Sequence, residues 1–414
     1  MGALPYGRHR VDEDDIAAVS EVLRSDFLTT GDAVGAFESA FAVTTGSAHA
    51  IACNNGTSAL YMAARAAGVG PGDVVIVPAL TFLATASAPH LAGAEVVFAD
   101  VEPDTGLMGT RQLDHALGEA HSRFPNAPVR AVFVVHLNGQ CADMPALRAA
   151  LDEAPGGEGI AIIEDACHAL GGEVSRLDES RSQGRASPVG ESRWSDMSVF
   201  SFHPVKTIAM GEGGAVTCRD GEIARRLNLL RNHSMERNPE AWSGGPRAFA
   251  PDGSANAWYY EMDEPSLNFR VPDILCALAL SQLDKLTEWV LKRRQLFDRY
   301  CELLPGASDA ASAPAQVTWG QPAWHLCAAQ IDFAACAIDR HSLMLALRAR
   351  GVGTQVHYIP VHRQPYWERR YGARSLAGAE HYYDHALSLP LYVDLELADV
   401  EYVVAALGEC LTDL

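Results

Sequence analysis

Short runs of β-branched residues alternate with helix-length segments in this chain. The runs lie at residues 74–77, 95–98, 129–135 and 160–163. Strands that alternate with helices build a mostly parallel sheet that is covered on its faces. Shorter strand candidates follow at residues 198–201 and 215–217. The sequence therefore predicts an α/β fold with a mostly parallel central sheet.

The second half of the chain has a different pattern. Residues 236–257 are rich in Pro, Gly, Ser and Asn, which predicts an exposed loop. Between residue 272 and about residue 300, apolar residues at helical spacing predict one long amphipathic helix able to link two domains. Strand-like and helical patterns are mixed beyond it. We expect a large domain at residues 12–265 and a smaller C-terminal α+β domain at residues 266–414.

Charge and composition exclude several classes of protein. The 414 residues include 52 acidic and 32 basic side chains, which gives a formal charge of −20. Because this charge repels nucleic acid and anionic membranes, we expect neither as a partner. No run reaches the roughly 18 apolar residues of a spanning helix, and the N-terminus lacks the apolar core of a signal peptide. Nine cysteines without a C-x-x-C pair indicate neither a disulfide framework nor a zinc site. We expect a cytoplasmic protein without a bound metal.

Lysine is rare, and Lys206, Lys285 and Lys292 are the only three. Lys285 and Lys292 lie among charged residues of the expected long helix, which is typical of a solvated face. Lys206 follows the strand candidate at residues 198–201 and precedes the glycine-rich residues 211–214. On a short loop at a strand end, a lysine is partly desolvated, which lowers its pKa and frees the amine to form an imine. A lone lysine is more often a surface residue, so its neighbours decide between the two interpretations.

Two further motifs favour the chemical interpretation of Lys206. Residues 54–60 read NNGTSAL, a small-residue turn that opens a helix. A helix N-terminus binds phosphate, although Ser and Thr also cap helices for stability. Residues 162–168 read IIEDACH, where Asp165 at the strand end can pair with a protonated pyridine nitrogen, cap a helix or join a buried ion pair. A phosphate turn, a strand-end acid and a lysine loop, in this order, favour a site for pyridoxal phosphate (PLP).

The segments NNGTSAL, EDACHALGG and SFHPVKTIAMGEGGAV resemble the DegT/DnrJ/EryC1/StrS sugar aminotransferases. The resemblance covers nearly the whole chain. It implies the fold-type I architecture of PLP enzymes, which is aspartate aminotransferase-like. Within the family, residues 6–31, 267–283 and 351–367 are most similar to the transaminases of pseudaminic acid synthesis, and the last of these segments, GVGTQVHYIPVHRQPYW, discriminates best.

The resemblance also implies a role for individual residues. Lys206 would carry PLP as a Schiff base, and Asp165 would pair with its pyridine nitrogen. The other residues expected around the cofactor are Gly56, Thr57, Ser58, Phe82, His168 and Ser201, together with Asn268 of a neighbouring subunit. That last residue implies at least a homodimer with shared active sites, and a tetramer stays open. Substrate contacts are expected from Tyr6 within the N-terminal residues 1–11, from Asp26, Phe27, Leu28 and Thr29, and from Gln355, Val356, His357 and Tyr358.

The implied reaction moves an amino group from L-glutamate to the keto group, at C4, of a nucleotide-linked 4-keto-6-deoxy amino sugar. Another keto-sugar or a cyclitol stays open as the substrate, and so does amination at C3. Lys206 argues against the dehydratases of the family, which have histidine in its place. Residues 211–216 lack the glycine spacing of a nicotinamide site, and His357 and His362 lack the spacing of a zinc hydrolase. A non-catalytic PLP-binding regulator is the alternative from another class.

Overall fold

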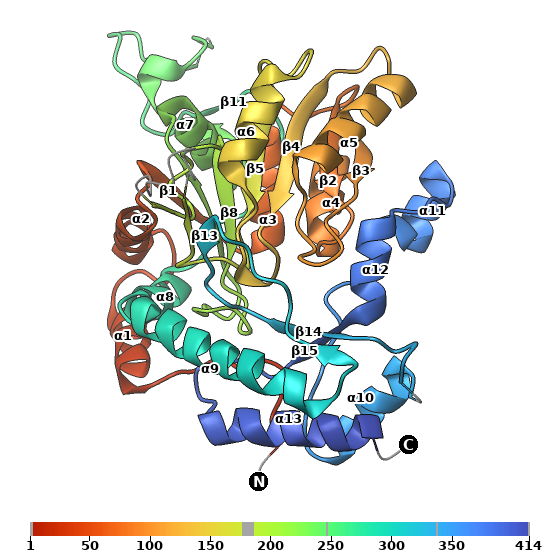
Figure 1. The fold of residues 1–414 in the computed structure, drawn as a ribbon. Helices are drawn as coiled ribbons and strands as arrows, with labels where there is room; N and C mark the ends of the chain where they lie inside the picture. The colour runs from red at the N-terminus through yellow and green to blue at the C-terminus, as the bar shows by residue number, and fades with distance from the viewer. Residues whose placement is uncertain (1–2, 176–185, 246, 337, 413–414) are drawn as a thin grey trace.

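The computed structural model describes residues 3–175, 186–245, 247–336 and 338–412 (Figure 1). Its largest sheet has seven strands in the order β1-β9-β8-β5-β4-β2-β3. In this sheet β9 is antiparallel to β1 and β8, and the other neighbouring strands are parallel. The predicted α/β fold with a mostly parallel central sheet is confirmed.

The predicted strands of this sheet are present with nearly the predicted bounds. They are β2 (Val74–Pro78), β3 (Glu95–Ala99), β4 (Val129–Val135), β5 (Ala161–Asp165), β8 (Met197–Ser201) and β9 (Gly214–Cys218). The edge strand β1 (His49–Cys53) lies outside the predicted runs. Along β2, Val74 and Ile76 pack in one apolar core and Val75 and Val77 in another. Both faces of the sheet are therefore buried, which explains the unbroken apolar runs.

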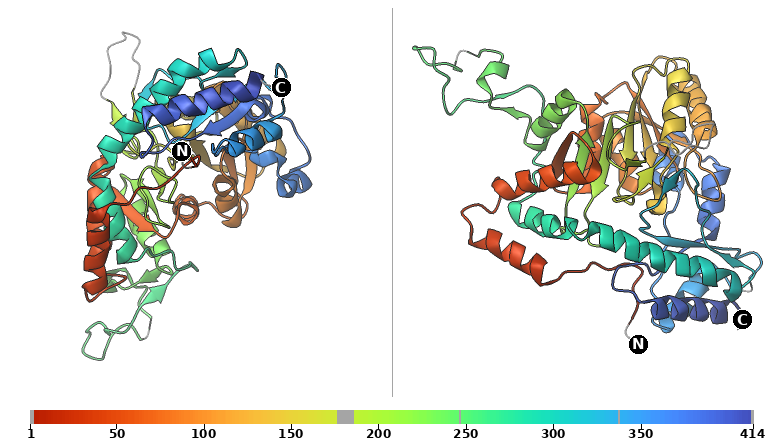
Figure 2. Two further views of the ribbon diagram at one scale, coloured as in Figure 1. Left: turned by 90° about the horizontal axis from the view of Figure 1, so that it is seen from below. Right: turned by 60° about the vertical axis from the view of Figure 1, so that its left-hand side comes forward.

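Helices cover both faces of this sheet (Figures 1 and 2). One face is covered by α2 (Asp32–Thr45), α5 (Thr110–Arg123) and α6 (Met144–Glu153). The other face is covered by α3 (Gly56–Ala66), α4 (Leu83–Leu91) and α7 (Gly221–Arg231). In such a layered fold, the loops beyond the carboxyl ends of the parallel strands are where binding sites form.

The prediction of one long helix between residues 272 and 300 is wrong. The chain forms two helices, α8 (Asp273–Leu283) and α9 (Leu286–Ala307), with a turn between them. At the turn, the Lys285 N–H donates to the Gln282 carbonyl, which is the tighter spacing of a 3₁₀ turn. The bend lets α8 pack against α1 (Glu13–Arg24) and α2, while α9 continues toward the C-terminal sheet.

Lys285 also departs from the expected solvated face. Its ammonium contacts the carboxylates of Asp12 and Asp15, the latter at 2.9 Å, and its side chain is 18% exposed. Lys292 pairs with Glu396 at 3.2 Å near the surface. The two lysines therefore tie helix α9 to other elements instead of standing free in solvent.

A second sheet lies in the C-terminal part of the chain. Its strands are β12 (Ala311–Ser312), β14 (Cys327–Ile331) and β15 (Ala386–Leu389), and neighbours are antiparallel. With α10 (Arg340–Ala349) and α13 (Leu397–Thr412) it encloses a separate apolar core. Helix α9 joins the two cores, because Trp289 packs in the first and Phe297 in the second. We propose residues 12–265 and 266–414 as the limits of the two domains.

The segment expected as an exposed loop projects beyond α7 (Figure 2). Apart from residue 246, it is described throughout and contains one short turn of helix, Pro239–Ala241. At its base, β10 (Met235–Glu236) pairs with β11 (Glu261–Met262). Within the described ranges, none of the helices is long and apolar enough to cross a membrane.

Candidate active site

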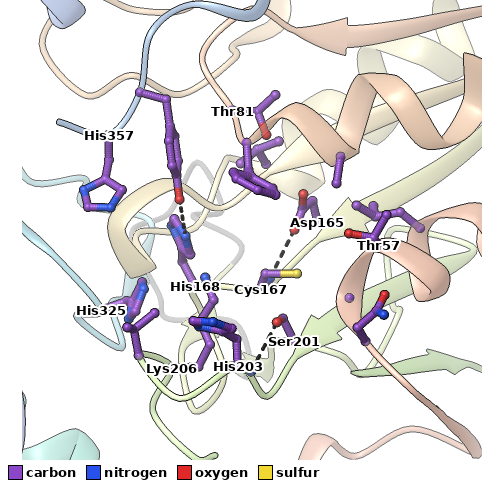
Figure 3. Close-up of a pocket in the computed structure, with 18 of the residues that line it drawn as sticks. Thr57, Thr81, Asp165, Cys167, His168, Ser201, His203, Lys206, His325 and His357 are labelled. Atoms are coloured by element: carbon purple, nitrogen blue, oxygen red, sulfur yellow. Dashed lines mark hydrogen bonds between the residues drawn. The ribbon is translucent and has the colours of Figure 1, made fainter. Parts of the chain in front are cut away.

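The predicted motifs meet at one cavity of about 490 Å³ at the carboxyl ends of β5 and β8 (Figure 3). Segments from the N-terminus, from the large sheet and from the C-terminal part all reach it. The residues predicted from the sequence that line it are Tyr6, Gly56, Thr57, Phe82, Asp165, His168, Ser201, Lys206, His357 and Tyr358. The structure therefore brings the lysine, the acid and the helix N-terminus to the same place.

The first turn of α3 faces the cavity. Asn55 caps the helix by accepting the Ser58 N–H at 2.8 Å, which leaves the first-turn N–H groups of Gly56 and Thr57 without intrahelical acceptors. A Cβ at Gly56 would lie 2.9 Å from Cβ of Ser201, so only glycine allows this close approach. The N–H groups and the two hydroxyls, of Thr57 and Ser201, together form a cradle that suits a phosphate.

The glycine-rich residues after Lys206 support the same turn. A Cβ at Gly214 would lie 2.5 Å from the carbonyl carbon and oxygen of Asn55. Glycine at the start of β9 therefore lets that strand pass directly behind the N-terminus of α3. Gly214 of this glycine-rich stretch therefore serves the close packing of the cradle.

Asp165 is the last residue of β5 and is 6% exposed. Its Oδ2 accepts a hydrogen bond from the Thr85 hydroxyl at 2.6 Å, and its Oδ1 accepts one from the Cys167 N–H at 3.3 Å. The Thr85 hydroxyl lies 2.7 Å from that of Thr81. These contacts orient the carboxylate in the cavity, where it can pair with a protonated ring nitrogen.

Lys206 lies in the turn that follows β8. Its N–H donates to the His203 carbonyl at 2.8 Å, and the turn closes with a 2.8 Å bond from the Met210 N–H to the Phe202 carbonyl. Burial lowers the pKa of the Lys206 amine, and Arg293 lowers it further, whereas Cys167 and Asp165 act in the opposite direction. A lowered pKa increases the share of neutral amine, which is the form that attacks a carbonyl.

The ring of His168 is fixed by two hydrogen bonds. The Asn138 N–H donates to Nδ1 at 3.3 Å, so the proton of the neutral ring must be on Nε2. Nε2 lies 3.0 Å from the oxygen of the Tyr358 hydroxyl, and its N–H donates a hydrogen bond to that oxygen. The hydroxyl of Tyr358 then keeps its own proton for donation to a molecule in the cavity.

Burial keeps His168, His325 and His357 neutral. It lowers the pKa of His168 and His325 well below the usual value and that of His357 to about 3. The nearby charge of Lys206 lowers all three further. At neutral pH these side chains therefore act as hydrogen-bonding groups and not as cations.

The other predicted residues do not line this cavity. Ser58 is buried behind it, and Asn268 is exposed, with its Oδ1 accepting the Arg270 N–H at 3.1 Å. Those expected to contact substrate but placed outside are Asp26, Phe27, Leu28, Thr29, Gln355 and Val356. The segment 26–29 is held on the surface next to α8, because the Asp273 N–H donates to the Leu28 carbonyl at 3.0 Å.

The cavity also has residues that the sequence interpretation missed, among them Asn55, Thr81, Cys167, His203 and His325. Asn55 carries a detectable signal, since asparagine before a helix is a typical N-cap. His325 carries none, because it stands alone between Trp324 and Leu326 just before β14. Its ring centroid lies 4.5 Å from that of His168.

Comparisons with known proteins agree with this geometry. The model of the DegT/DnrJ/EryC1/StrS aminotransferase family matches residues 9–408. The spore coat polysaccharide biosynthesis protein SpsC of Bacillus subtilis is 33% identical over 412 residues, or 98% of this chain and 96% of SpsC. PseC of Helicobacter pylori, an aminotransferase involved in the biosynthesis of pseudoaminic acid, is 25% identical, with a TM-score of 0.84 and 100% of both chains covered. The PLP form of Spr1654 from Streptococcus pneumoniae, a putative sugar aminotransferase, shares the fold at 24% identity, with a TM-score of 0.82 over 99% of each chain.

The residues of the cavity fit pyridoxal phosphate in three respects. Gly56 leaves the cradle free of the Cβ that would fill it. The Asp165 carboxylate is oriented for a ring nitrogen, and Lys206 supplies an amine of lowered pKa for an aldehyde. With the match over residues 9–408, these features show that the chain belongs to the DegT/DnrJ/EryC1/StrS aminotransferase family, whose cofactor is pyridoxal phosphate.

Proposed function

We propose that this protein transfers an amino group from L-glutamate to the C4 keto group of a nucleotide-linked 4-keto-6-deoxy amino sugar. Its family makes it a PLP-dependent sugar aminotransferase, and the donor, the sugar and the carbon atom are the proposal. The observation that carries it is the convergence of Lys206, Asp165 and the N-terminus of α3 on one cavity. Similarity to PseC, an aminotransferase involved in the biosynthesis of pseudoaminic acid, supports a sugar substrate for this enzyme.

PLP, when bound, supplies an aldehyde that takes up amino groups and a ring that withdraws electrons from the reacting carbon. Lys206 would hold that aldehyde covalently in the resting enzyme. Once displaced by an incoming amine, its Nζ would move a proton between the substrate carbon and the C4′ carbon of the cofactor, as general base and then general acid. Asp165 would keep the ring nitrogen protonated. The N–H groups of Gly56 and Thr57 and the hydroxyl of Ser201 would bind the phosphate.

The charge of the cavity supports a shared site. Among the described residues that line it, Lys206 is the only lysine or arginine. A helix N-terminus contributes only about half a positive charge, which is less than a phosphate and a substrate carboxylate bring. We propose a homodimer in which the exposed Asn268 of each chain reaches the phosphate site of the other, where its neutral amide would add a hydrogen-bond donor. The exposed segment 26–29 would contact substrate from the same interface.

Visible absorption tests the proposal in both half-reactions. The PLP-loaded protein should show the band of the lysine-bound cofactor. L-glutamate should bleach this band, and UDP-4-keto-6-deoxy-N-acetylhexosamine should restore it. If glutamate bleaches the band and this sugar does not restore it, the enzyme aminates another keto-sugar or a cyclitol. If PLP binds and glutamate has no effect, the non-catalytic regulator is favoured.

Substitution of Lys206 tests the central assignment. Lys206→Ala should lose the lysine-bound absorption and all turnover, because no other lysine or arginine lines the described cavity. Lys292→Ala is the matched control, since Lys292 pairs with Glu396 at 3.2 Å away from the cavity. The control should keep both properties. Turnover retained by Lys206→Ala would refute the role of this lysine.

A further inference from the structure

Gln282 of α8 is fully buried and does not line the cavity. Both the oxygen and the nitrogen of its side-chain amide nevertheless form hydrogen bonds. Oε1 accepts the N–H of Ala209 at 2.9 Å, and Nε2 donates to the carbonyl of Arg10 at 2.9 Å. Nε2 also lies 3.2 Å from Oδ2 of Asp15. One side chain therefore joins three segments that are far apart in the sequence: α8 itself, residues 10–15 and the turn that contains Ala209.

Two of these segments lead directly into the cavity. Ala209 belongs to the turn of residues 202–210, the lysine turn, which carries Lys206. Arg10 belongs to residues 3–11, the N-terminal strap, which carries Tyr6. At its far end the strap is tied to the C-terminal part of the chain, where the Leu4 N–H donates to the Gly351 carbonyl at 2.8 Å. The side chain of Gln282 thus links the strap to the lysine turn through hydrogen bonds.

The orientation of the Gln282 amide is fixed by Asp15. This carboxylate is fully buried and receives hydrogen bonds from the Ser281 hydroxyl at 2.6 Å and from the Lys285 ammonium at 2.9 Å. Because a carboxylate accepts and does not donate, the NH₂ group of Gln282 must face it. Its oxygen then faces the Ala209 N–H. A flipped amide would lose all three bonds, so the arrangement has one stable orientation.

We propose that Gln282 is a positioning residue that holds the lysine turn and the N-terminal strap in register, so that Lys206 and Tyr6 face the same cavity. The inference rests on the proposed role of Lys206. Gln282 itself touches neither cofactor nor substrate and acts through Ala209 and Arg10. A buried apolar side chain of the same length would fill the same volume, so the amide is explained by its hydrogen bonds and not by packing.

Hydrogen exchange of the cofactor-free protein tests the proposal without reference to catalysis. Gln282→Met keeps the length of the side chain and removes its polar atoms. Loss of one ordinary hydrogen bond corresponds to about tenfold faster exchange, which we expect in peptides from both the lysine turn and the strap. Ser281→Ala is the matched control, because it removes a neighbouring hydrogen bond to Asp15 and leaves the contacts of Gln282 with Ala209 and Arg10 in place. It should leave exchange in the two segments unchanged.

A second variant separates the two contacts. Gln282→Glu keeps an oxygen for the Ala209 N–H. Once its carboxyl is ionised, it has no donor for the Arg10 carbonyl and repels the Asp15 carboxylate, which lies 3.2 Å from this position. Exchange measured at alkaline pH, where the new carboxyl ionises, should therefore rise more in the strap than in the lysine turn. This variant also decides the question if Gln282→Met does not fold. Unchanged exchange in the strap of Gln282→Glu, or in both segments of a folded Gln282→Met, would overturn the proposal.

In the PLP-loaded protein, the pH midpoint of the lysine-bound absorption is the second readout. Asp165 and Cys167 from the end of β5 and Arg293 from α9 act on Lys206 electrostatically and are unaltered. The neutral His168, His325 and His357 are unaltered as well. We expect Gln282→Met to move the midpoint by about half a pH unit and Ser281→Ala to leave it in place. A wild-type protein without this band would refute the proposed function and leave the exchange result valid. A normal band with the same midpoint in Gln282→Met would count against the inference alone.

Discussion

Replacing Gly56 with alanine probes the phosphate cradle directly. The added Cβ would lie 2.9 Å from Cβ of Ser201, 3.3 Å from its Oγ and 3.5 Å from Sγ of Cys167. Carbon atoms pack favourably at about 3.5–4.0 Å, so the start of α3 and the end of β8 must separate by roughly 0.6–1 Å. Such overpacking costs about 1–3 kcal/mol of unfolding free energy. The separation also moves the helix N–H groups away from the Ser201 hydroxyl, so one phosphate no longer reaches both.

The same substitution at Gly118 provides the matched control. Gly118 is exposed in the middle of α5, and a Cβ there meets nothing within 4 Å. Alanine is favoured over glycine in a helix interior by about 0.8–1 kcal/mol. Gly118→Ala should therefore stabilise the protein. The same glycine-to-alanine substitution at these two helical positions is therefore expected to change the unfolding free energy in opposite directions.

Urea unfolding of the cofactor-free protein and a PLP titration measure the two effects separately. Gly56→Ala should lower the unfolding free energy by about 1–3 kcal/mol. It should also weaken PLP binding by about tenfold or more, which is the effect of losing one charge-assisted hydrogen bond. Gly118→Ala should raise stability and leave PLP binding unchanged. A Gly56→Ala protein that matches the wild type in both measurements would refute the cradle.

Two further substitutions test the surroundings of the cofactor. Thr85→Val removes the donor to Asp165, and because hydrogen bonds to charged groups contribute about 1.5–3 kcal/mol, PLP retention in equilibrium dialysis should fall by about tenfold or more. Retention equal to the wild type would contradict the role of Thr85. His357 has a folded-state pKa of about 3 and an unfolded-state value near 6.5, so the unfolded chain binds more protons between these values and stability falls as the pH drops through this window. His357→Asn keeps an acceptor for Ser388 and cannot titrate. Between pH 7 and pH 5 this variant should therefore lose about 2 kcal/mol less unfolding free energy than the wild type, as measured by urea unfolding. Equal losses in the two proteins would contradict the assignment.

Strands of the large sheet could be predicted because a strand buried on both faces needs an unbroken apolar run. Such a run is a local property, and β2, β4 and β5 begin within one residue of their predicted starts. The break between α8 and α9 could not be predicted in this way. The apolar spacing continues across it, and the turn is stabilised by the contact of Lys285 with Asp12 and Asp15 of the distant N-terminal segment.

Lys206 and Asp165 were accessible to sequence analysis because Asp165 ends a strand and Lys206 lies in the turn after one. The carboxyl ends of neighbouring parallel strands meet at one edge of a sheet, and β5 pairs with β8. Asn268 and the segment 26–29 follow no such rule. They are placed by loops on the surface, and the role expected for Asn268 requires a second chain. Gln282 was equally hidden, because its function lies in bonds to Ala209 and Arg10 that no local pattern encodes.

The turn Leu137–Gly139 explains why His325 and the hydrogen bonding of His168 could not be predicted from local sequence patterns. Asn138 has a φ of 61°, in the left-handed region that residues other than glycine seldom adopt, and this directs its N–H to Nδ1 of His168. Its carbonyl accepts the His325 N–H at 2.8 Å. A Cβ at Gly139 would lie 2.0 Å from the Ala323 carbonyl oxygen. Only glycine at this position therefore allows the segment that carries His325 to pack against the turn. One turn after β4 therefore sets the proton position on His168 and admits His325, and a side chain at Gly139 should disturb both histidines together.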